Sequence, residues 1–253
     1  MRPTLFEISG LKVHSFGAML VIAFFTAILF AKSRAKRFGL EPNTVYDAAI
    51  WALIPGVIGA RLFFVVQEWS HYSKHPGEIF TRFEGLTSFG GIVFGAIGLL
   101  LWCKLAKKNV GALMDTIAPS FLIAHAIGRI GCLLNGCCHG GHCDLPWAVR
   151  VEGETGLFHP AQVYDSLLNI GALMLLLAIE RRGLARGGTL AVMLILHGLT
   201  RFIYEFWRAG STSTYMGSLP ITDAQAFALA ISTLGVFLFM RSRKAPKADL
   251  QSV

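Results

Sequence analysis

Seven long apolar segments, separated by short polar or basic stretches, constrain this chain more than any other feature of its sequence. They lie at residues 16–31, 46–67, 88–103, 111–131, 161–179, 188–206 and 221–240. A helix needs about 20 apolar residues to cross the hydrocarbon core of a bilayer. Of the 253 residues, 54% are hydrophobic and only 15% are charged, a balance too apolar for a soluble domain. The sequence therefore predicts an all-α integral membrane protein, with about seven transmembrane helices in a single polytopic domain over residues 1–240.

Lys and Arg residues are concentrated after alternate segments, and this sets the expected orientation. Such residues accumulate in short cytoplasmic loops. They follow the first, third, fifth and seventh segments: Lys32, Arg34, Lys36, Arg37, Lys104, Lys107, Lys108, Arg181, Arg182, Arg186, Arg241, Arg243, Lys244 and Lys247. We therefore expect the N-terminus outside and the C-terminus in the cytoplasm, with residues 241–253 as a flexible basic tail. The net charge of +8 follows mainly from this bias, so we expect no nucleic-acid partner.

Three arginines, Arg61, Arg129 and Arg201, lie within or at the ends of these segments. A charge near the middle of a bilayer costs about 2.5–3.5 kcal/mol, so such residues usually line a polar cavity and mark a functional site. Arg61 leaves two interpretations open, an anion site or a pair with Glu68 on the same helix face. Arg129 and Arg201 lie toward the outer ends of their helices, where we expect them to share one cavity. Two guanidinium groups suit a phosphodiester, which each can bind through paired hydrogen bonds.

The sixth segment also carries a polar stripe, formed by His197, Arg201 and Glu205. Residues four apart lie on the same face of a helix. One interpretation is structural: Arg201 and Glu205 form an ion pair within the helix, and their opposite charges cancel. The other is functional, with Glu205 orienting Arg201 toward a ligand.

A cysteine-rich stretch leads into the loop expected outside the membrane, near residues 133–158. Its pattern is Cys-x4-Cys-Cys-His-x2-His-Cys, formed by Cys132, Cys137, Cys138, His139, His142 and Cys143. This spacing matches no common zinc template, and adjacent cysteines seldom both bind one metal ion. The sequence therefore predicts no metal site. A disulfide within the loop and simple packing both remain open.

The same region carries a family resemblance. The run Gly128-Arg-Ile-Gly-Cys-Leu-Leu-Asn-Gly-Cys-Cys-His-Gly140 resembles the signature of the prolipoprotein diacylglyceryl transferases, in a variant form with cysteines at polar positions. Further segments agree, in the family's order: Ser15-Phe-Gly-Ala-Met19, Gly59-Ala-Arg-Leu62, Asp115 with Ala118-Pro119, His159-Pro-Ala-Gln-Val-Tyr-Asp165 and Gly198-Leu-Thr-Arg-Phe-Ile-Tyr-Glu-Phe206. The resemblance covers nearly all seven segments.

The resemblance implies an enzyme that transfers the diacylglyceryl group of phosphatidylglycerol to the lipobox cysteine in the signal peptide of a prolipoprotein. A thioether forms and glycerol phosphate is released. The expected location is the bacterial cytoplasmic (inner) membrane, where membrane lipids surround the chain and the active site lies toward the outer face. No metal or cofactor is implied.

The resemblance also assigns site residues. Arg129 and Arg201 match the family's two critical arginines, Asn135 and Gly140 match further signature positions, and Glu205 follows the second arginine by one turn. The expected substrate-binding set is completed by Gly90, Gly91 and Arg61.

Several polar positions of the family pattern are changed. Phe89 replaces the histidine or tyrosine that precedes the two glycines, and a phenyl ring can neither accept a proton nor donate a hydrogen bond. His197 and His139 are the residues best placed to assume a catalytic role instead. The alternative is a paralogue that acts on another lipid or acceptor. A lipid or anion transporter, and a membrane redox or metal protein, are the interpretations from other functional classes.

Overall fold

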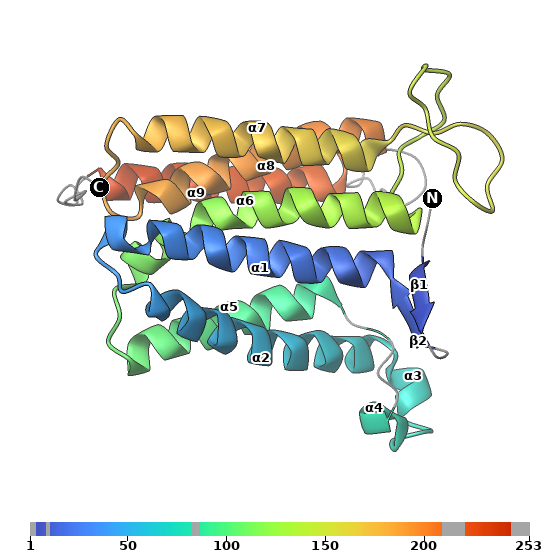
Figure 1. Cartoon of the computed structure of the whole chain (residues 1–253), viewed down its shortest axis with the longest axis horizontal. Coiled ribbons are helices and arrows are strands. Elements are labelled where there is room, and N and C mark those ends of the chain that lie inside the picture. The colour runs from blue at the N-terminus through green and yellow to red at the C-terminus, as the bar shows by residue number, and fades with distance from the viewer. Residues whose placement is uncertain (1–3, 9–10, 82–84, 86, 209–220, 244–253) are drawn as a thin grey trace. The chain divides into compact units, whose positions relative to one another are not determined.

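Helices dominate the structure, a computed structural model that describes residues 4–8, 11–81, 85, 87–208 and 221–243 (Figure 1). Long helices occupy all seven predicted positions: α1 (Ser15–Ala35), α2 (Asn43–Gln67), α5 (Ser88–Leu105), α6 (Val110–Asn135), α7 (Ala161–Glu180), α8 (Gly188–Arg208) and α9 (Asp223–Ser242). Within the described residues, six of these helices are long and apolar enough to cross a membrane, and α5 is a shorter apolar helix. The predicted all-α, multi-pass membrane class is confirmed.

Short elements supplement the long helices. Two strands, β1 (Thr4–Ile8) and β2 (Leu11–His14), pair as an antiparallel hairpin ahead of α1, and a 3-10 helix, η1 (Lys36–Phe38), follows it. Two single-turn helices, α3 (Trp69–Tyr72) and α4 (Glu78–Thr81), lie between α2 and α5. Helix α9 continues to Ser242, and residues 244–253 of the predicted tail lie outside the described residues.

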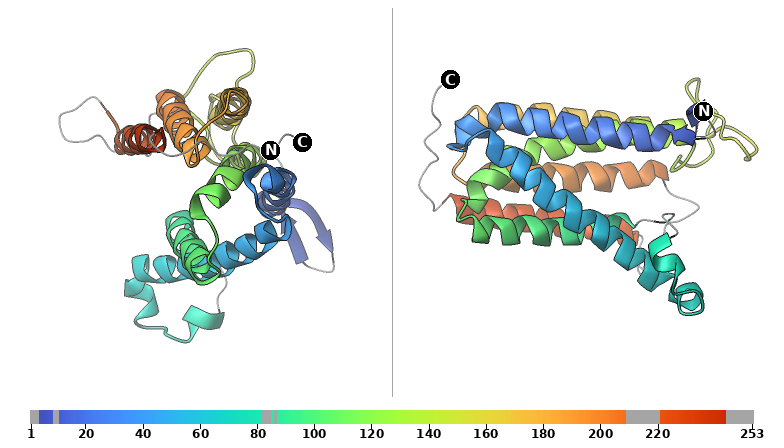
Figure 2. Two further views of the ribbon diagram at one scale, coloured as in Figure 1. Left: turned by 90° about the vertical axis from the view of Figure 1, so that its left-hand side faces the viewer. Right: turned by 60° about the horizontal axis from the view of Figure 1, so that its bottom comes forward.

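The chain divides into two compact units, Met1–Gly39 with Met114–Val253, and Leu40–Leu113. In the first unit α1, α6, α7, α8 and α9 run alongside one another (Figure 2). Leu122, Leu176 and Met193, from α6, α7 and α8, belong to its buried apolar core. Helices α8 and α9 pack closely at Gly198, where any side chain would collide with the backbone of α9. The absence of a side chain on this glycine permits the close approach.

Charged groups join the helices of the first unit at the end that holds the start of α8. Glu180, buried at the end of α7, lies 2.6 Å from Arg34 Nη2 and 2.7 Å from Arg37 Nη1. The carboxylate of Asp115 accepts hydrogen bonds from the backbone N–H groups of Gly187 (2.6 Å) and Leu190 (2.9 Å). These groups lie at the start of α8, where N–H groups have no partner within the helix and a negative charge is favourable. The helix positions are therefore fixed at the end opposite the α6–α7 loop.

Glycines form the contact between α2 and α5 in the second unit. A side chain at Gly90 would collide with the carbonyl oxygen of Gly59, and one at Gly95 would make a tight contact with the carbonyl oxygen of Ala52. Gly91 lies against Gly56 and Ala60. Small residues let the backbones of membrane helices approach closely. The two predicted substrate-binding glycines, Gly90 and Gly91, are therefore helix-packing positions in this unit.

Candidate active site

Arg129 of α6 and Arg201 of α8 meet at one aromatic ring. The guanidinium carbon of each lies 4.8 Å from the centre of the Tyr204 ring. The two carbons are therefore no further apart than twice this distance. Tyr204 is fully buried, whereas the arginine side chains keep 16% and 20% of their surface exposed. The structure thus brings the two arginines together, as their places in the sequence predict.

Each arginine has a buried carboxylate beside it. Arg201 Nη1 donates a hydrogen bond of 2.7 Å to Glu205 Oε2, one turn later in α8. Arg129 Nε lies 2.6 Å from Asp165 Oδ2 of α7, but its N–H is not aligned with that oxygen, so the contact is an ion pair rather than a hydrogen bond. The other guanidinium nitrogens of these arginines make no hydrogen bond to any residue that the structure describes. Those nitrogens are available to an anion.

Asp165 connects Arg129 to two histidines. Its Oδ2 lies 3.2 Å from His125 Nε2, and its Oδ1 accepts a hydrogen bond of 2.7 Å from Asn169 Nδ2. Asn169 Oδ1 lies 3.1 Å from His197 Nδ1. The rings of His125 and His197 meet edge to face, with 5.1 Å between their centres. A polar cluster from α6, α7 and α8 therefore surrounds one buried carboxylate.

The partners of the two histidines determine which ring nitrogen of each carries hydrogen. A carboxylate only accepts, so Asn169 must turn its amide nitrogen to Asp165 and its oxygen to His197. His197 Nδ1 must then donate to that oxygen, and His125 Nε2 must donate to Asp165. In the neutral rings the lone pair resides on His197 Nε2 and His125 Nδ1. Either nitrogen is able to accept a proton.

Backbone hydrogen bonds hold the α6–α7 loop against the end of α8. The N–H of Gly140 donates to the carbonyl oxygen of His159 (2.9 Å), and that of Gly141 to the carbonyl oxygen of Trp207 (3.1 Å). A side chain at Gly140 would collide with the same Trp207 carbonyl. Gly140, a predicted substrate-binding residue, thus permits the close approach of the loop to α8.

His139 and Asn135 lie in or beside this loop. His139 Nε2 is 3.0 Å from Glu154 Oε1, and its ring centre is 4.5 Å from that of Phe158. Asn135 is exposed at the end of α6. Of the two histidines proposed from the sequence, His197 belongs to the cluster around Asp165, whereas the contacts of His139 are with other residues of its loop.

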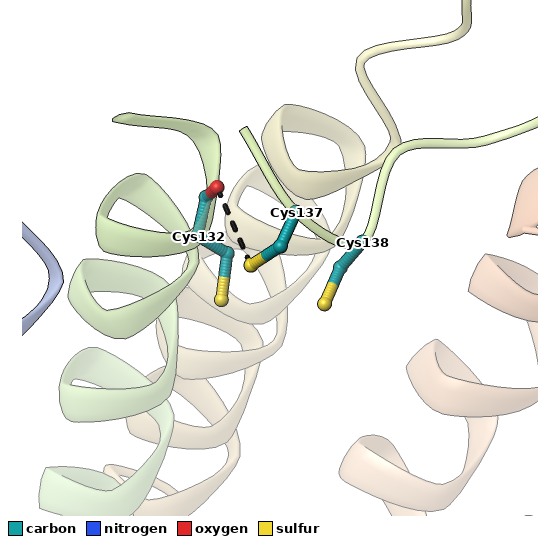
Figure 3. Close-up of side chains that lie close together, drawn as sticks. All are labelled: Cys132, Cys137 and Cys138. Atoms are coloured by element: carbon teal, nitrogen blue, oxygen red, sulfur yellow. Dashed lines mark hydrogen bonds between the residues drawn. The ribbon is translucent and has the colours of Figure 1, made fainter. Parts of the chain in front are cut away.

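Three cysteines at the end of α6 and in the loop that follows it come together (Figure 3). The sulfur atoms of Cys132, Cys137 and Cys138 lie within 4.8 Å of one another. All five cysteines of the chain are free thiols. Hydrogen bonds from Cys132 and Cys137 and the charge of Arg129 outweigh desolvation and lower the pKa of Cys138 to about 5. Burial raises the pKa of Cys137.

Arg61 belongs to the second unit. Its Nη2 donates hydrogen bonds to the carbonyl oxygens of Glu78 (3.2 Å) and Ile79 (3.1 Å), and its guanidinium carbon lies 5.2 Å from the centre of the Tyr72 ring. These contacts fasten the segment with α3 and α4 to α2. Phe89 is 59% exposed, and its ring centre lies 5.3 Å from that of Phe63.

Asp165, Asn169, His125 and Tyr204 complete the cluster but were not identified from the sequence as site residues. A carboxylate in an apolar helix is as costly as an arginine and usually pairs with one, so Asp165 carried a usable signal. Asn169 follows it by one turn on the same face. The sequence did not predict that Asp165 pairs with Arg129, because the two residues come from different helices.

Comparison with known proteins agrees with the resemblance seen in the sequence. Residues 3–241 match the family described as Prolipoprotein diacylglyceryl transferase. A phosphatidylglycerol–prolipoprotein diacylglyceryl transferase of Clostridium novyi is 33% identical over 260 aligned positions, covering 99% of this chain and 100% of that protein. Proteins of the same name from Finegoldia magna and Clostridium tetani are 32% and 29% identical, over 94% of this chain and 95% and 97% of their own lengths. The chain therefore belongs to the prolipoprotein diacylglyceryl transferase family.

Proposed function

We propose that this protein transfers the diacylglyceryl group of phosphatidylglycerol to the lipobox cysteine of a prolipoprotein. The substrate sulfur attacks the glyceryl carbon that carries the phosphate. The bond from that carbon to the phosphate oxygen breaks, a thioether forms, and glycerol phosphate leaves with the electron pair. The thiol proton passes to a base. The names of the relatives, which specify this lipid and prolipoproteins, support the choice of substrates.

The single observation that carries the proposal is the meeting of Arg129 and Arg201 at the Tyr204 ring. Negative charge grows on the phosphate as it leaves. Donors that are already in place where charge develops lower the barrier, because they need not reorganise during the reaction. Asp165 and Glu205 hold one nitrogen of each arginine and leave the others directed to the ligand.

The cluster offers two proton acceptors, His125 Nδ1 and His197 Nε2. The carboxylate of Asp165 faces His125 and stabilises the positive ring that forms on protonation, whereas the hydrogen-bond partner of His197 is the neutral oxygen of Asn169. We therefore assign proton acceptance to His125 and the support of its ring to His197.

An apolar groove of about 620 Å³ between α7 and α8 suits a lipid chain. Its lining includes Leu167, Leu175 and Leu199, and Trp147 Nε1 donates a hydrogen bond of 2.7 Å to the hydroxyl of Tyr164 at its rim. Trp and Tyr favour the headgroup level of a bilayer. We assign the groove to an acyl chain of the donor lipid.

We further place residues 1–240 in the bacterial cytoplasmic membrane as one polytopic domain. The distribution of basic residues supports an external α6–α7 loop near residues 133–158 and a cytoplasmic tail at 241–253. In this orientation the arginines meet their substrates from the outer face.

The test is a reconstituted assay with phosphatidylglycerol and a lipobox peptide, in which mass spectrometry detects the thioether. Arg129→Ala and Arg201→Ala should each lower the rate about 10²–10³-fold, the usual cost of losing one electrostatic contact to developing charge. Arg129→Lys and Arg201→Lys should also reduce it, because lysine keeps the charge but loses the planar fork. Normal thioether formation by the double alanine variant would refute the proposal.

Arg186→Ala is the matched control. This arginine is exposed in the loop between α7 and α8, far along α8 from Arg201, and its loss removes the same charge from the chain. We expect the wild-type rate from this variant.

A further inference from the structure

We propose that Cys132, Cys137 and Cys138 form a binding site for a soft monovalent metal ion of the copper(I) type. Their sulfur atoms lie within 4.8 Å of one another, which is close to the spacing that three thiolates adopt around one ion of this class. Thiolates select soft ions such as Cu(I) and Zn²⁺ over hard ones.

The fold brings the three cysteines together, although their spacing in the sequence matches no common metal-binding pattern. Cys132 lies in the last turns of α6, and Cys137 and Cys138 follow the turn at Gly136 (Figure 3). Cys138 has a φ of +63°, in the left-handed region that residues with a side chain rarely adopt. With this backbone conformation, the side chains of the adjacent residues Cys137 and Cys138 both lie close to Cys132. Their adjacency in the sequence alone did not predict this arrangement.

The number of ligands favours a monovalent ion. Among the described residues, no fourth Cys, His, Asp or Glu atom joins the group of three sulfurs. Structural zinc sites have four protein ligands, and a zinc ion with three protein ligands needs a water as its fourth. Copper(I) is satisfied by three sulfur ligands in a plane, so the group is complete without a further residue.

The surrounding charge also suits this ion. One Cu⁺ bound by three thiolates leaves a net charge of −2 on the site. Arg129, one turn before Cys132 in α6, acts electrostatically on Cys132 and Cys138, and Arg208 acts on Cys138. Two positive side chains therefore act on the site, although each is also paired with a carboxylate, Arg129 with Asp165 and Arg208 with Glu205.

The site is accessible, and it is connected to the loop. Cys138 is exposed, and Cys132 and Cys137 are half-buried, so an ion can enter without unfolding the chain. The carbonyl oxygens of Cys137 and Cys138 accept hydrogen bonds from Gln162 and Tyr204. An ion bound here will hold the loop to α7 and α8.

The experiment uses the full-length, fully reduced protein in detergent without oxygen. Cu(I) is supplied from a coloured Cu(I) chelator, and the bound metal is measured from the loss of colour. We expect one Cu(I) per chain and three sulfur neighbours in the X-ray absorption spectrum. Cys132→Ser, Cys137→Ser and Cys138→Ser should each lower the affinity at least about tenfold, since each removes a ligand.

Cys143→Ser and Cys103→Ser are matched controls, because both remove a cysteine outside the group of three. Both should bind copper as the wild type does. Copper should also raise the Tm of the wild type and of Cys143→Ser but not of Cys137→Ser, since an ion that binds only the folded state stabilises it. This comparison separates loss of a ligand from loss of the fold.

Two results would overturn the proposal. One is equal copper binding by the wild type and by the Cys132→Ser, Cys137→Ser, Cys138→Ser triple variant. The other is retention of Zn²⁺ in preference to Cu(I) when both are supplied, which would exclude a monovalent site. Neither measurement requires turnover, so the outcome is independent of the proposed transferase activity.

Discussion

Asp165 Oδ2 lies 2.6 Å from Arg129 Nε, so a buried carboxylate on α7 holds an arginine of α6. Its other contacts, to His125 and Asn169, make it the only described residue that joins the arginine to the histidines. Breaking such a buried pair by removing one partner typically costs about 3–5 kcal/mol of stability.

The first prediction follows from this pair. Asp165→Asn should lower the Tm, and should lower kcat more than it raises KM, because Arg129 is then no longer held for the transition state. The Asp165→Asn, Arg129→Lys double variant should lose less than the two single losses combined, since both disrupt one interaction. Additive losses in rate would show that Asp165 acts only on the fold.

Tyr204 supports the second prediction. Its ring contacts both guanidinium groups, while its hydroxyl donates a long hydrogen bond of 3.5 Å to the carbonyl oxygen of Cys138. Tyr204→Phe keeps the ring and should retain most of the activity. Tyr204→Leu removes two cation–π contacts, each worth about 0.5–2 kcal/mol, and should lower kcat/KM about tenfold or more. Equal activity of the two variants would show that the ring does not position the arginines.

Much of the fold was predictable, because the length of an apolar segment is a direct consequence of bilayer thickness. The meeting of Arg129 and Arg201 was also predictable, since both lie toward the same end of their helices. Asp165, Asn169 and Tyr204 were not, because their roles depend on which helix faces which. The hairpin of β1 and β2 was missed because two strands of five and four residues carry little periodic signal.

The third prediction concerns the thiols. A pKa of about 5 leaves Cys138 as thiolate from neutral pH down to pH 6, whereas burial holds Cys137 as the thiol. The thiolate is the nucleophile, so iodoacetamide should modify Cys138 before Cys137 at pH 6, and this labelling should decline below about pH 5. Peptide mass spectrometry of metal-free protein identifies the site. Labelling of Cys138 that begins only above pH 8 would contradict the lowered pKa of its thiol.

The fourth prediction concerns orientation. Gly141 is hydrogen-bonded to Trp207 near the end of α8, and Ser242 lies near Gly188 at its start. Helix α8 has 21 residues, which at about 1.5 Å each span about 30 Å, the thickness of the hydrocarbon core. The two sites therefore lie on opposite sides of the membrane, and the basic residues around the C-terminal site favour the cytoplasm for it. A reporter inserted at Gly141 should read external, and one fused after Lys247 should read cytoplasmic. The reverse result would place the arginines on the wrong side for prolipoproteins.

The fifth prediction separates the three histidines. A positioned base typically contributes about 10²–10⁴-fold to the rate, so His125→Phe should show the largest loss. His197→Phe keeps a ring against His125 but loses the hydrogen bond to Asn169, and should show a smaller loss. His139→Phe should be nearly neutral, because His139 contacts Glu154 and Phe158 rather than the cluster around Asp165. The measurement is the single-turnover rate of thioether formation by the wild type and by each of the three variants at one fixed pH. Full activity in all three variants would mean that no histidine accepts the proton, and that the substrate thiol ionises in the field of Arg129 and Arg201.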